Sequence, residues 1–204
     1  MPRIRAASID EHKELTRRAI LESAKELIAE TGTAEISLGE LSAAAGIGRT
    51  TFYEYFADRD DVIASLVEDE LPAVISEMIA SVESGSTTER LSGLVEATVE
   101  FVVNNSVLGL ILHTEVPRLG ASAQNRIRIA HSALSQEMAA LYVTGVAEGA
   151  FRELEPQLAG RLIQDSIMSA AKTVISSPDP LQSVGRITEG VREFLVAGLR
   201  ATES

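Results

Sequence analysis

Hydrophobic residues recur every three to four positions along most of this chain, which is the spacing of amphipathic α-helices. An early example runs from Thr16 to Gly32, where the glycine marks the expected end of the helix. Its apolar stripe consists of Ile20, Leu21, Ala24, Leu27 and Ile28. No alternating pattern is long enough to predict a strand, so the chain is expected to be all-α.

The segment from Ser37 to Phe56 predicts two short helices joined by a tight turn. Ser37 suits an N-cap because Glu40, three residues on, completes a capping box. The run Gly46-Ile-Gly would break the first helix, since glycine reaches positive φ without steric cost. A second helix is then expected from about Arg49 to Phe56.

The second of these helices has an unusual outward face. Phe52 and Phe56 are four residues apart, so they share a side that we expect to be buried. The opposite side carries Thr50, Thr51 and Tyr53, where a solvated helix normally shows Lys, Glu or Gln. Helix, glycine turn and contact surface together indicate a helix-turn-helix module, whose second helix enters the DNA major groove.

The rest of the chain predicts further helices separated by short breaks. A connecting helix at about 58–71 meets Pro72, which is expected to kink or restart it. A loop at 83–88 would supply the cap of the next helix, from Thr87 or Thr88. After a break at 104–106, helices are expected at about 122–148, 156–176 and 181–201.

Composition fits a folded protein of the cell interior. The 204 residues are 45% hydrophobic, enough for a real core, and the absence of cysteine fits a reducing cytosol. No apolar run is long enough to span a membrane, and the N-terminus lacks a signal-peptide pattern. We expect a cytoplasmic protein with a helix-turn-helix domain at 1–60 and a second helical domain at 61–204, without cofactor or metal.

The charge balance bears on the DNA-binding prediction. The net charge is −12, and residues 1–60 carry 8 basic and 11 acidic residues. DNA affinity depends largely on Lys and Arg that neutralise phosphates, whereas distant acidic residues are partly screened at physiological salt. The balance permits DNA binding and predicts weak non-specific affinity. A basic N-terminal cluster consists of Arg3, Arg5, Lys13, Arg17 and Arg18.

The run GIGRTTFYEYFADRDDVI, residues 46–63, resembles the recognition-helix signature of the tetracycline-repressor (TetR) family of transcriptional regulators. In that family Thr or Ala precedes an aromatic-Tyr pair, then His or Tyr, Phe and a polar cluster. The same order runs from Thr51 to Asp60, and the helix at 16–32 is similar to the family's first helix. The resemblance implies a three-helix DNA-binding domain followed by a helical ligand-binding and dimerisation domain, about nine helices in all.

The resemblance also implies a role for each residue of the recognition segment. Arg49, Thr50 and Tyr53 match positions that approach bases. The alternative for the tyrosines is that their rings pack and only their hydroxyls reach water. Contacts nearer the phosphates and the DNA backbone are expected from Thr51, Tyr55, Arg59, Ser37 and Arg17.

Three residues depart from the family pattern. Gly48 stands where a hydroxyl residue commonly caps the recognition helix, and Gly39 where a polar side chain is frequent. Glu54 would either accept a hydrogen bond from a cytosine amino group or repel phosphates. DNA binding is therefore predicted through a segment that includes Gly48 and Glu54, while the operator sequence stays open.

By resemblance, the C-terminal domain holds a pocket for an unidentified small molecule whose binding releases the DNA. A ligand shifts such an equilibrium only by binding the two states unequally. The expected lining is apolar with a few polar groups, and each member could instead be plain core. These residues are Phe101, Leu108, Ile111, Leu112, His113, Tyr142 and Met168.

The last two helices carry apolar stripes that are expected to form a homodimer interface. The alternative is that the stripes only cover the core of their own chain. A two-fold dimer would place two recognition helices one DNA turn, or a multiple of it, apart over palindromic operator DNA. The stripe residues are Leu162, Ile163, Ile167, Ala170, Val174, Ile187, Val191, Phe194, Leu195 and Gly198.

Two other function classes stay open. A helical protein-interaction module that has lost DNA binding would also fit the acidic balance and Glu54. A helical enzyme would rest on Ser169 and Lys172, which have the SxxK spacing but lack the companion motifs. A metal site at His113-Thr-Glu115 would lack a third ligand of the right spacing. We expect a ligand-responsive regulator, by family default a repressor, and not an enzyme.

Overall fold

The computed structural model describes residues 2–32 and 35–201, with side chains from Glu11 onward, so Arg3 and Arg5 lie outside the described side chains. The described chain is almost entirely helical, with one isolated antiparallel bridge between Phe151 and Arg200. The all-α prediction is confirmed. The helices are α1 (Pro2–Thr31), α2 (Leu38–Ala44), α3 (Arg49–Phe52), α4 (Arg59–Ser81), α5 (Thr87–Asn104), α6 (Ser106–Leu110), α7 (Ala121–Ala130), α8 (Ser132–Ala147), α9 (Pro156–Ile175) and α10 (Pro180–Leu199).

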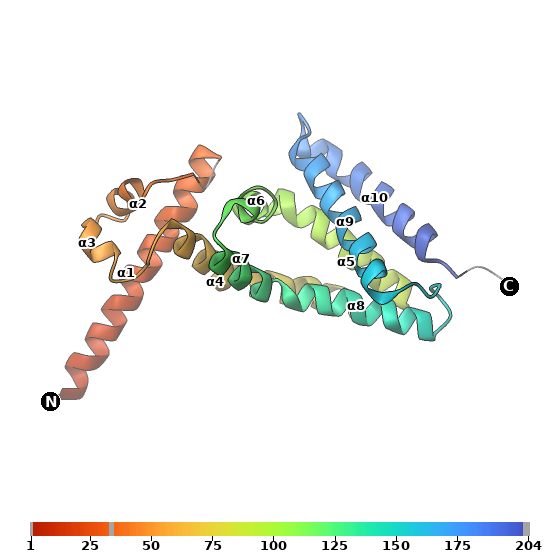
Figure 1. Ribbon diagram of the computed structural model, residues 1–204, viewed down its shortest axis with the longest axis horizontal. Coiled ribbons are helices and arrows are strands. Elements are labelled where there is room, and N and C mark those ends of the chain that lie inside the picture. The colour runs from red at the N-terminus through yellow and green to blue at the C-terminus, as the bar shows by residue number, and fades with distance from the viewer. Residues whose placement is uncertain (1, 33–34, 202–204) are drawn as a thin grey trace.

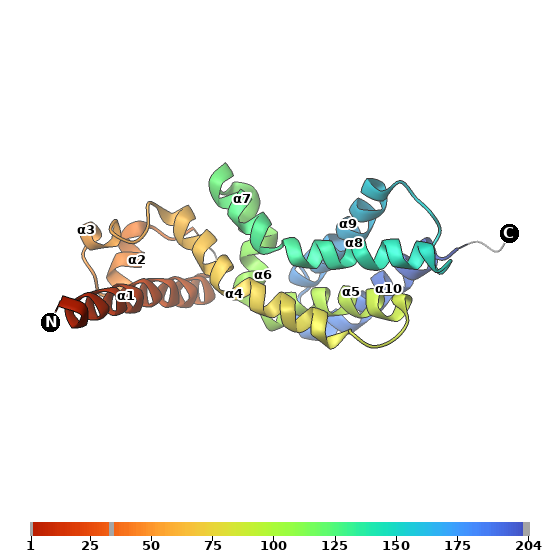
Figure 2. The ribbon, with the colours of Figure 1, turned by 90° about the horizontal axis from the view of Figure 1, so that it is seen from below.

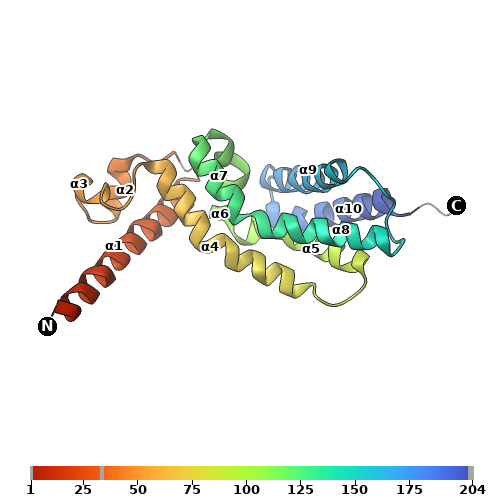
Figure 3. The same cartoon turned by 60° about the horizontal axis from the view of Figure 1, so that its bottom comes forward.

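The helices gather into two groups joined by α4 (Figures 1 and 2). Helices α1, α2 and α3 lie at one end of the molecule, and α5, α8, α9 and α10 run side by side at the other (Figure 3). Helix α4 starts beside α3, packs against α1 and α7, and continues under α5 and α8. Its N-terminal half is buried almost all round, from Val62 to Val67.

Short-range hydrogen bonds end the recognition segment earlier than the sequence pattern indicates. Helix α3 stops at Phe52, one turn short of the predicted end at residue 56. The amides of Tyr55 and Phe56 both donate to the Phe52 carbonyl, which turns the chain toward α4. Asp58 then caps α4 by accepting from the Asp61 amide at 2.8 Å.

Pro72 does not interrupt the connecting helix, so the predicted restart is wrong, and the predicted kink stays a prediction. It lies inside α4, which continues to Ser81. Leu71 and Ile75 on either side are 2% and 1% exposed. Packing of this face therefore outweighs the backbone hydrogen bond that proline removes.

Two more helix boundaries differ from the pattern. Ser86, not Thr87 or Thr88, caps α5 and forms a capping box with Glu89. The predicted helix at 122–148 divides into α7 and α8 at His131.

The break at residues 104–106 is a sharp bend. The segments Thr87–Asn104 and Ser106–Arg118 meet at 103°. No single helix of the described chain is long and apolar enough to cross a membrane, and this bent pair has that length and composition only as a whole. A π-helical turn, Ile111–Glu115, and a 3-10 turn, Val116–Arg118, lead from α6 into α7.

Candidate functional site

The turn between α2 and α3 is held by a complete Schellman motif. Gly46, at φ 66°, occupies the left-handed region that favours glycine. Its amide donates to the Ala43 carbonyl at 3.1 Å, and the Ile47 amide donates to the Ser42 carbonyl at 3.0 Å. These bonds satisfy the end of α2 and fix the direction in which α3 leaves the turn.

The start of α2 is fixed as the sequence predicts. The Ser37 hydroxyl accepts from the Glu40 amide at 3.2 Å, and the Glu40 carboxylate accepts from the Ser37 amide at 2.7 Å. This bond lowers the pKa of Glu40, because the carboxylate accepts from the hydroxyl side chain and the backbone of Ser37. The cap positions Ser37 at an exposed helix N-terminus.

Helix α3 presents one buried and one exposed side. Phe52 is 1% exposed and packs against Phe56, with ring centroids 5.9 Å apart. Arg49, Thr50, Tyr53 and Glu54 are exposed, and Tyr53 is 53% exposed with its ring edge-on to Phe52. Gly48 is the N-cap of α3 and offers no side-chain cap. The exposed set is polar and unobstructed within the chain.

The other predicted phosphate contacts are partly engaged inside the molecule. Thr51 and Tyr55 are half-buried, and Tyr55 packs against the core. Arg59 pairs with Asp60 at 3.3 Å. Arg17 makes a bidentate bond to Asp69 of α4 at 2.7 and 3.2 Å, which raises the pKa of the guanidinium. Arg17 therefore joins α1 to α4, and its predicted contact with DNA stays a prediction.

Helix α4 is tied to α7 by one arginine. Arg126 donates to both carboxylate oxygens of Glu68 at 2.9 and 2.5 Å, to Asp61 at 2.5 Å and to the Ser65 hydroxyl at 2.8 Å. The hydrogen bonds to Glu68 and Asp61 raise the pKa of this guanidinium. Asp60 also accepts from the Gly120 amide at the start of α7, at 2.8 Å. A change at α7 would therefore reach the first turns of α4 directly.

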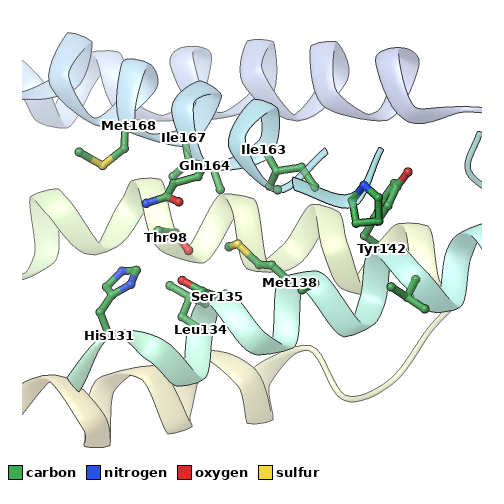
Figure 4. A pocket seen from close by; sticks show the side chains of 14 residues that line it. Thr98, His131, Leu134, Ser135, Met138, Tyr142, Ile163, Gln164, Ile167 and Met168 are labelled. Carbon is green, nitrogen blue, oxygen red and sulfur yellow. The ribbon is translucent and has the colours of Figure 1, made fainter. Parts of the chain in front are cut away.

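An apolar cavity of about 180 Å³ lies between α8 and α9, and Thr98 of α5 also lines it (Figure 4). It runs along α8 from His131 to Val143, about 18 Å at the helical rise of 1.5 Å per residue. Its other lining residues are Leu134, Ser135, Met138, Ala139, Tyr142, Pro156, Gly160, Ile163, Gln164, Ile167 and Met168.

Tyr142 closes the end of the cavity opposite His131 (Figure 4). Its hydroxyl accepts from the Leu154 amide at 2.8 Å and donates to the Arg152 carbonyl at 3.2 Å. Its ring stacks on Phe151 with centroids 6.3 Å apart. This wall is therefore rigid, whereas Met138 and Met168 line the cavity with flexible thioethers.

Of the predicted ligand contacts, the structure brings Tyr142 and Met168 to this cavity. Phe101, Leu108 and Ile111 are buried, Leu112 and His113 are half-buried, and none of these five lines it. The sequence analysis missed Thr98, His131 and Met138. The available signal was His131, a polar residue inside an apolar helical pattern.

The outer side of α9 and α10 bears an exposed apolar surface. Phe194 is 68% and Leu162 46% exposed, and with Ile187 and Val191 they line a shallow groove. Gly198 is exposed, while the remaining predicted interface residues are buried within their own chain. Those buried residues are Ile163, Ile167, Ala170, Val174 and Leu195.

The two residues with SxxK spacing lie on the surface of the molecule. Ser169 and Lys172 are exposed on α9 and border a surface groove. In the part of the chain that the structure describes, no group of three His, Cys, Asp or Glu side chains could hold a metal ion.

Comparisons with known proteins agree with this geometry. Residues 20–66 match the sequence profile of bacterial regulatory proteins of the tetR family, and residues 84–172 match that of the tetracyclin repressor-like C-terminal domain. The fatty acid metabolism regulator protein of Bacillus subtilis (strain 168) is 21% identical over 182 residues, 88% of this chain and 93% of that protein.

Solved structures of low identity share the fold. The transcriptional regulator FadR from Bacillus subtilis, in complex with stearoyl-CoA, superposes with a TM-score of 0.76 at 21% identity, covering 90% of this chain and 99% of its own. AibR, in complex with isovaleryl coenzyme A and operator DNA, gives a TM-score of 0.70 at 19% identity, covering 89% and 98%.

Proposed function

This chain belongs to the TetR family of bacterial regulatory proteins, and on that premise we propose that it is a dimeric repressor that a ligand with an apolar acyl chain releases from operator DNA. The observation that carries the DNA-binding role is the exposed side of α3. Arg49, Thr50 and Tyr53 project from a one-turn helix whose other side is buried and whose entry is fixed by the Gly46 turn. Such a preorganised polar helix suits the major groove.

The dimer that we propose uses the outer face of α9 and α10. Exposed Phe194 and Leu162 with half-buried Ile187 and Val191 form an apolar patch that would be unfavourable in water. A two-fold axis through this patch would give two copies of α3 for the two halves of a palindrome. The buried members of the predicted interface would support this surface from behind.

For the effector we propose an acyl thioester of coenzyme A. The support is the apolar cavity between α8 and α9, together with two relatives whose structures hold stearoyl-CoA and isovaleryl coenzyme A. An apolar cavity of about 150 Å³ is known to bind benzene, so about 180 Å³ admits a short acyl chain without rearrangement. Longer chains would require Met138 and Met168 to move.

The proposed route of coupling runs through Arg126. An effector that parts α8 from α9 would shift α7, and the bonds of Arg126 would carry that shift to α4 and so to α3. Such coupling requires unequal binding of the effector to the two states. We further propose that the protein acts in the cytoplasm, on DNA, and has no catalytic activity.

The DNA-binding role is tested by selecting random duplex DNA with protein that has been denatured and refolded to remove any ligand. Wild type should enrich a palindrome. Thr50→Ala and Tyr53→Ala should weaken binding of the enriched sequence about 5- to 100-fold, as for the loss of a base contact. Thr144→Ala, an exposed threonine on α8, is the matched control and should bind as wild type. A folded dimer that enriches nothing would support a protein-interaction module instead.

The coupling is tested with Arg126→Ala, compared with Arg128→Ala. Arg128 is an exposed neighbour on α7 that bonds only Asn125 in the described structure. Arg126→Ala should lower stability by about 2 kcal/mol, because the ion pairs that it breaks are partly exposed. It should also abolish the effect of acyl-CoA on operator affinity, measured by fluorescence anisotropy. A normal response in Arg126→Ala would exclude this route.

A further inference from the structure

Arg17 of α1 is held against α4 by a bond with a defined geometry. Its two terminal nitrogens donate to the two carboxylate oxygens of Asp69, at 2.7 and 3.2 Å. A bidentate arginine–carboxylate pair fixes the plane of the guanidinium group as well as its position. A second ion pair, Lys25 with Glu70 at 2.8 Å, lies about two turns further along α1 and keeps the same two helices together.

The guanidinium group of Arg17 lies over the aromatic residues that support α3. Its central carbon, Cζ, is 5.9 Å from the centroid of the Phe56 ring. Phe56 is 2% exposed, and its ring packs against Phe52, the buried residue of α3. Tyr53, on the exposed side of α3, is edge-on to Phe52. A continuous series of contacts therefore runs from Asp69 on α4, through Arg17, to the side of α3 that we expect to face DNA.

These contacts bear on the electrostatic role of Arg17. Its side chain is 30% exposed, and the carboxylate of Asp69 neutralises its charge. The pair carries no net charge, so it offers a DNA phosphate less attraction than an unpaired arginine would. The observed partners of Arg17 are a carboxylate and an aromatic ring of its own chain, and both lie next to the recognition segment.

We infer that Arg17 is a positioning residue for the recognition segment and not a contact to the DNA backbone. Paired with Asp69, it holds the Phe56 ring in place. That ring supports Phe52 and so the orientation of α3 in the major groove. The inference rests on the proposed DNA-binding role and assigns Arg17 a different task from the one that the family resemblance implies.

The two roles differ in the salt dependence of DNA binding. Each phosphate that a protein neutralises steepens the plot of log affinity against log salt concentration by about 0.9. Fluorescence anisotropy of the full-length protein over a range of KCl concentrations gives this slope, on the selected operator and on unrelated DNA. In the positioning role, Arg17→Met should lower operator affinity about fivefold and leave the slope and the affinity for unrelated DNA unchanged. A slope reduced by about 0.9, with equal losses on both DNAs, would overturn the inference.

The variant Asp69→Asn separates the two roles by the sign of its effect. If Arg17 contacted a phosphate, removing the charge of Asp69 would release the guanidinium group and raise operator affinity. In the positioning role, the weaker pair loosens Arg17 over Phe56, and operator affinity should fall about threefold. Glu26→Gln, which removes one negative charge from an exposed residue of α1, is the matched control. An increase relative to this control would contradict the positioning role.

The variant Arg17→Lys keeps the charge and loses the planar guanidinium group. A lysine can still attract a phosphate as a point charge, but it cannot make the bidentate bond. Arg17→Lys should therefore lose operator affinity as Arg17→Met does, and wild-type affinity in this variant would count against positioning. Arg128→Met, at an exposed arginine of α7, is the control for the loss of a positive charge and should bind as wild type.

Failure of the inference is separable from failure of the proposed function. Circular dichroism shows whether each variant is folded, and Asp69→Asn decides the question if Arg17→Met does not fold. If refolded wild type selects no operator, the DNA-binding role fails and the inference fails with it. If wild type binds its operator and the slope falls in Arg17→Met, only the inference fails.

Discussion

In the DNA-binding module, Ser37, Asp58 and the turn at Gly46 pair the groups at the helix ends, whereas the C-terminal domain leaves buried polar atoms without partners. Within residues 11–32 and 35–201, three buried side-chain atoms lack a hydrogen bond, and all three lie C-terminal to α4. They are His113 Nδ1, Glu115 Oε2 and Thr188 Oγ1. Each such atom costs about 1–3 kcal/mol of stability.

This difference corresponds to two functions with opposite requirements. A DNA reader gains from a fixed helix, and the turn at Gly46 and the buried Phe52 hold α3 in place. An effector domain gains from a state that a ligand can improve, and the apolar cavity between α8 and α9 is a space that a ligand can fill. Arg126 of α7 links the two regions of the molecule through its ion pairs with α4.

The largest expected effect concerns how fully each region is packed. Phe52→Ala should destabilise the protein by about 3–5 kcal/mol, because Phe52 is 1% exposed and fills the core of the module. Met138→Ala should cost about 2 kcal/mol or less, because one side of Met138 already faces a cavity. Urea denaturation followed by circular dichroism measures both. Equal losses would mean that the cavity is filled and packed like the rest of the core.

The next effect is a dependence of stability on pH. The pKa of His113 is lowered from about 6.5 in the unfolded chain to about 4 in the folded protein, mainly by burial. The unfolded chain therefore binds more protons between these values, and stability is lost as the pH falls from about 7 to 4. The loss reaches about 3 kcal/mol.

The variant His113→Phe isolates this contribution from the carboxylates that titrate in the same range. Free energies of unfolding are compared at pH 7.5, 6.5, 5.5 and 4.5 for wild type and variant. The wild-type curve should fall more steeply, by nearly the full difference at the lowest pH. Parallel curves would show that His113 is not buried as a neutral group.

The sequence predicted the module better than the cavity because the two depend on interactions of different range. Ser37 with Glu40, and the glycine at 46, are local signals whose structural meaning requires no knowledge of the rest of the fold. The lining of the cavity comes from three helices, and an apolar residue follows the same helical spacing whether it packs against core or faces a void. The sequence pattern therefore could not separate Tyr142 and Met168, which line the cavity, from residues such as Ile111, which are buried in the core.

Pro72 illustrates the same limit. Local rules place a kink or a helix boundary there, yet buried Leu71 and Ile75 hold α4 continuous across it. The opposite case occurs at His131, where the chain breaks between α7 and α8 although no proline or glycine predicts a break. This break places a polar residue at the cavity. Long-range packing decides both cases.

The smallest expected effect tests whether the turn before α3 is fixed by its local conformation. Gly46 has φ 66° and Gly48 has φ −74°, and in both places an added Cβ would meet no atom within 4 Å. Gly46→Ala should therefore destabilise the protein by about 1–2 kcal/mol through backbone strain alone. Gly48→Ala should change stability by less than about 0.5 kcal/mol, because two effects offset each other. Alanine lowers the entropy of the unfolded chain, which stabilises the fold, but it is a poorer N-cap than glycine.

Thermal and urea unfolding measures the stability of both variants. Their surfaces are nearly identical, so a difference in stability reports the backbone conformation at residue 46. Operator affinity supplies a second readout, since Gly46→Ala should also weaken DNA binding by loosening the angle at which α3 leaves the turn. Equal stability in the two variants would mean that tertiary packing, and not the Schellman turn, sets the position of α3. The module would then depend on the rest of the fold as strongly as the cavity does.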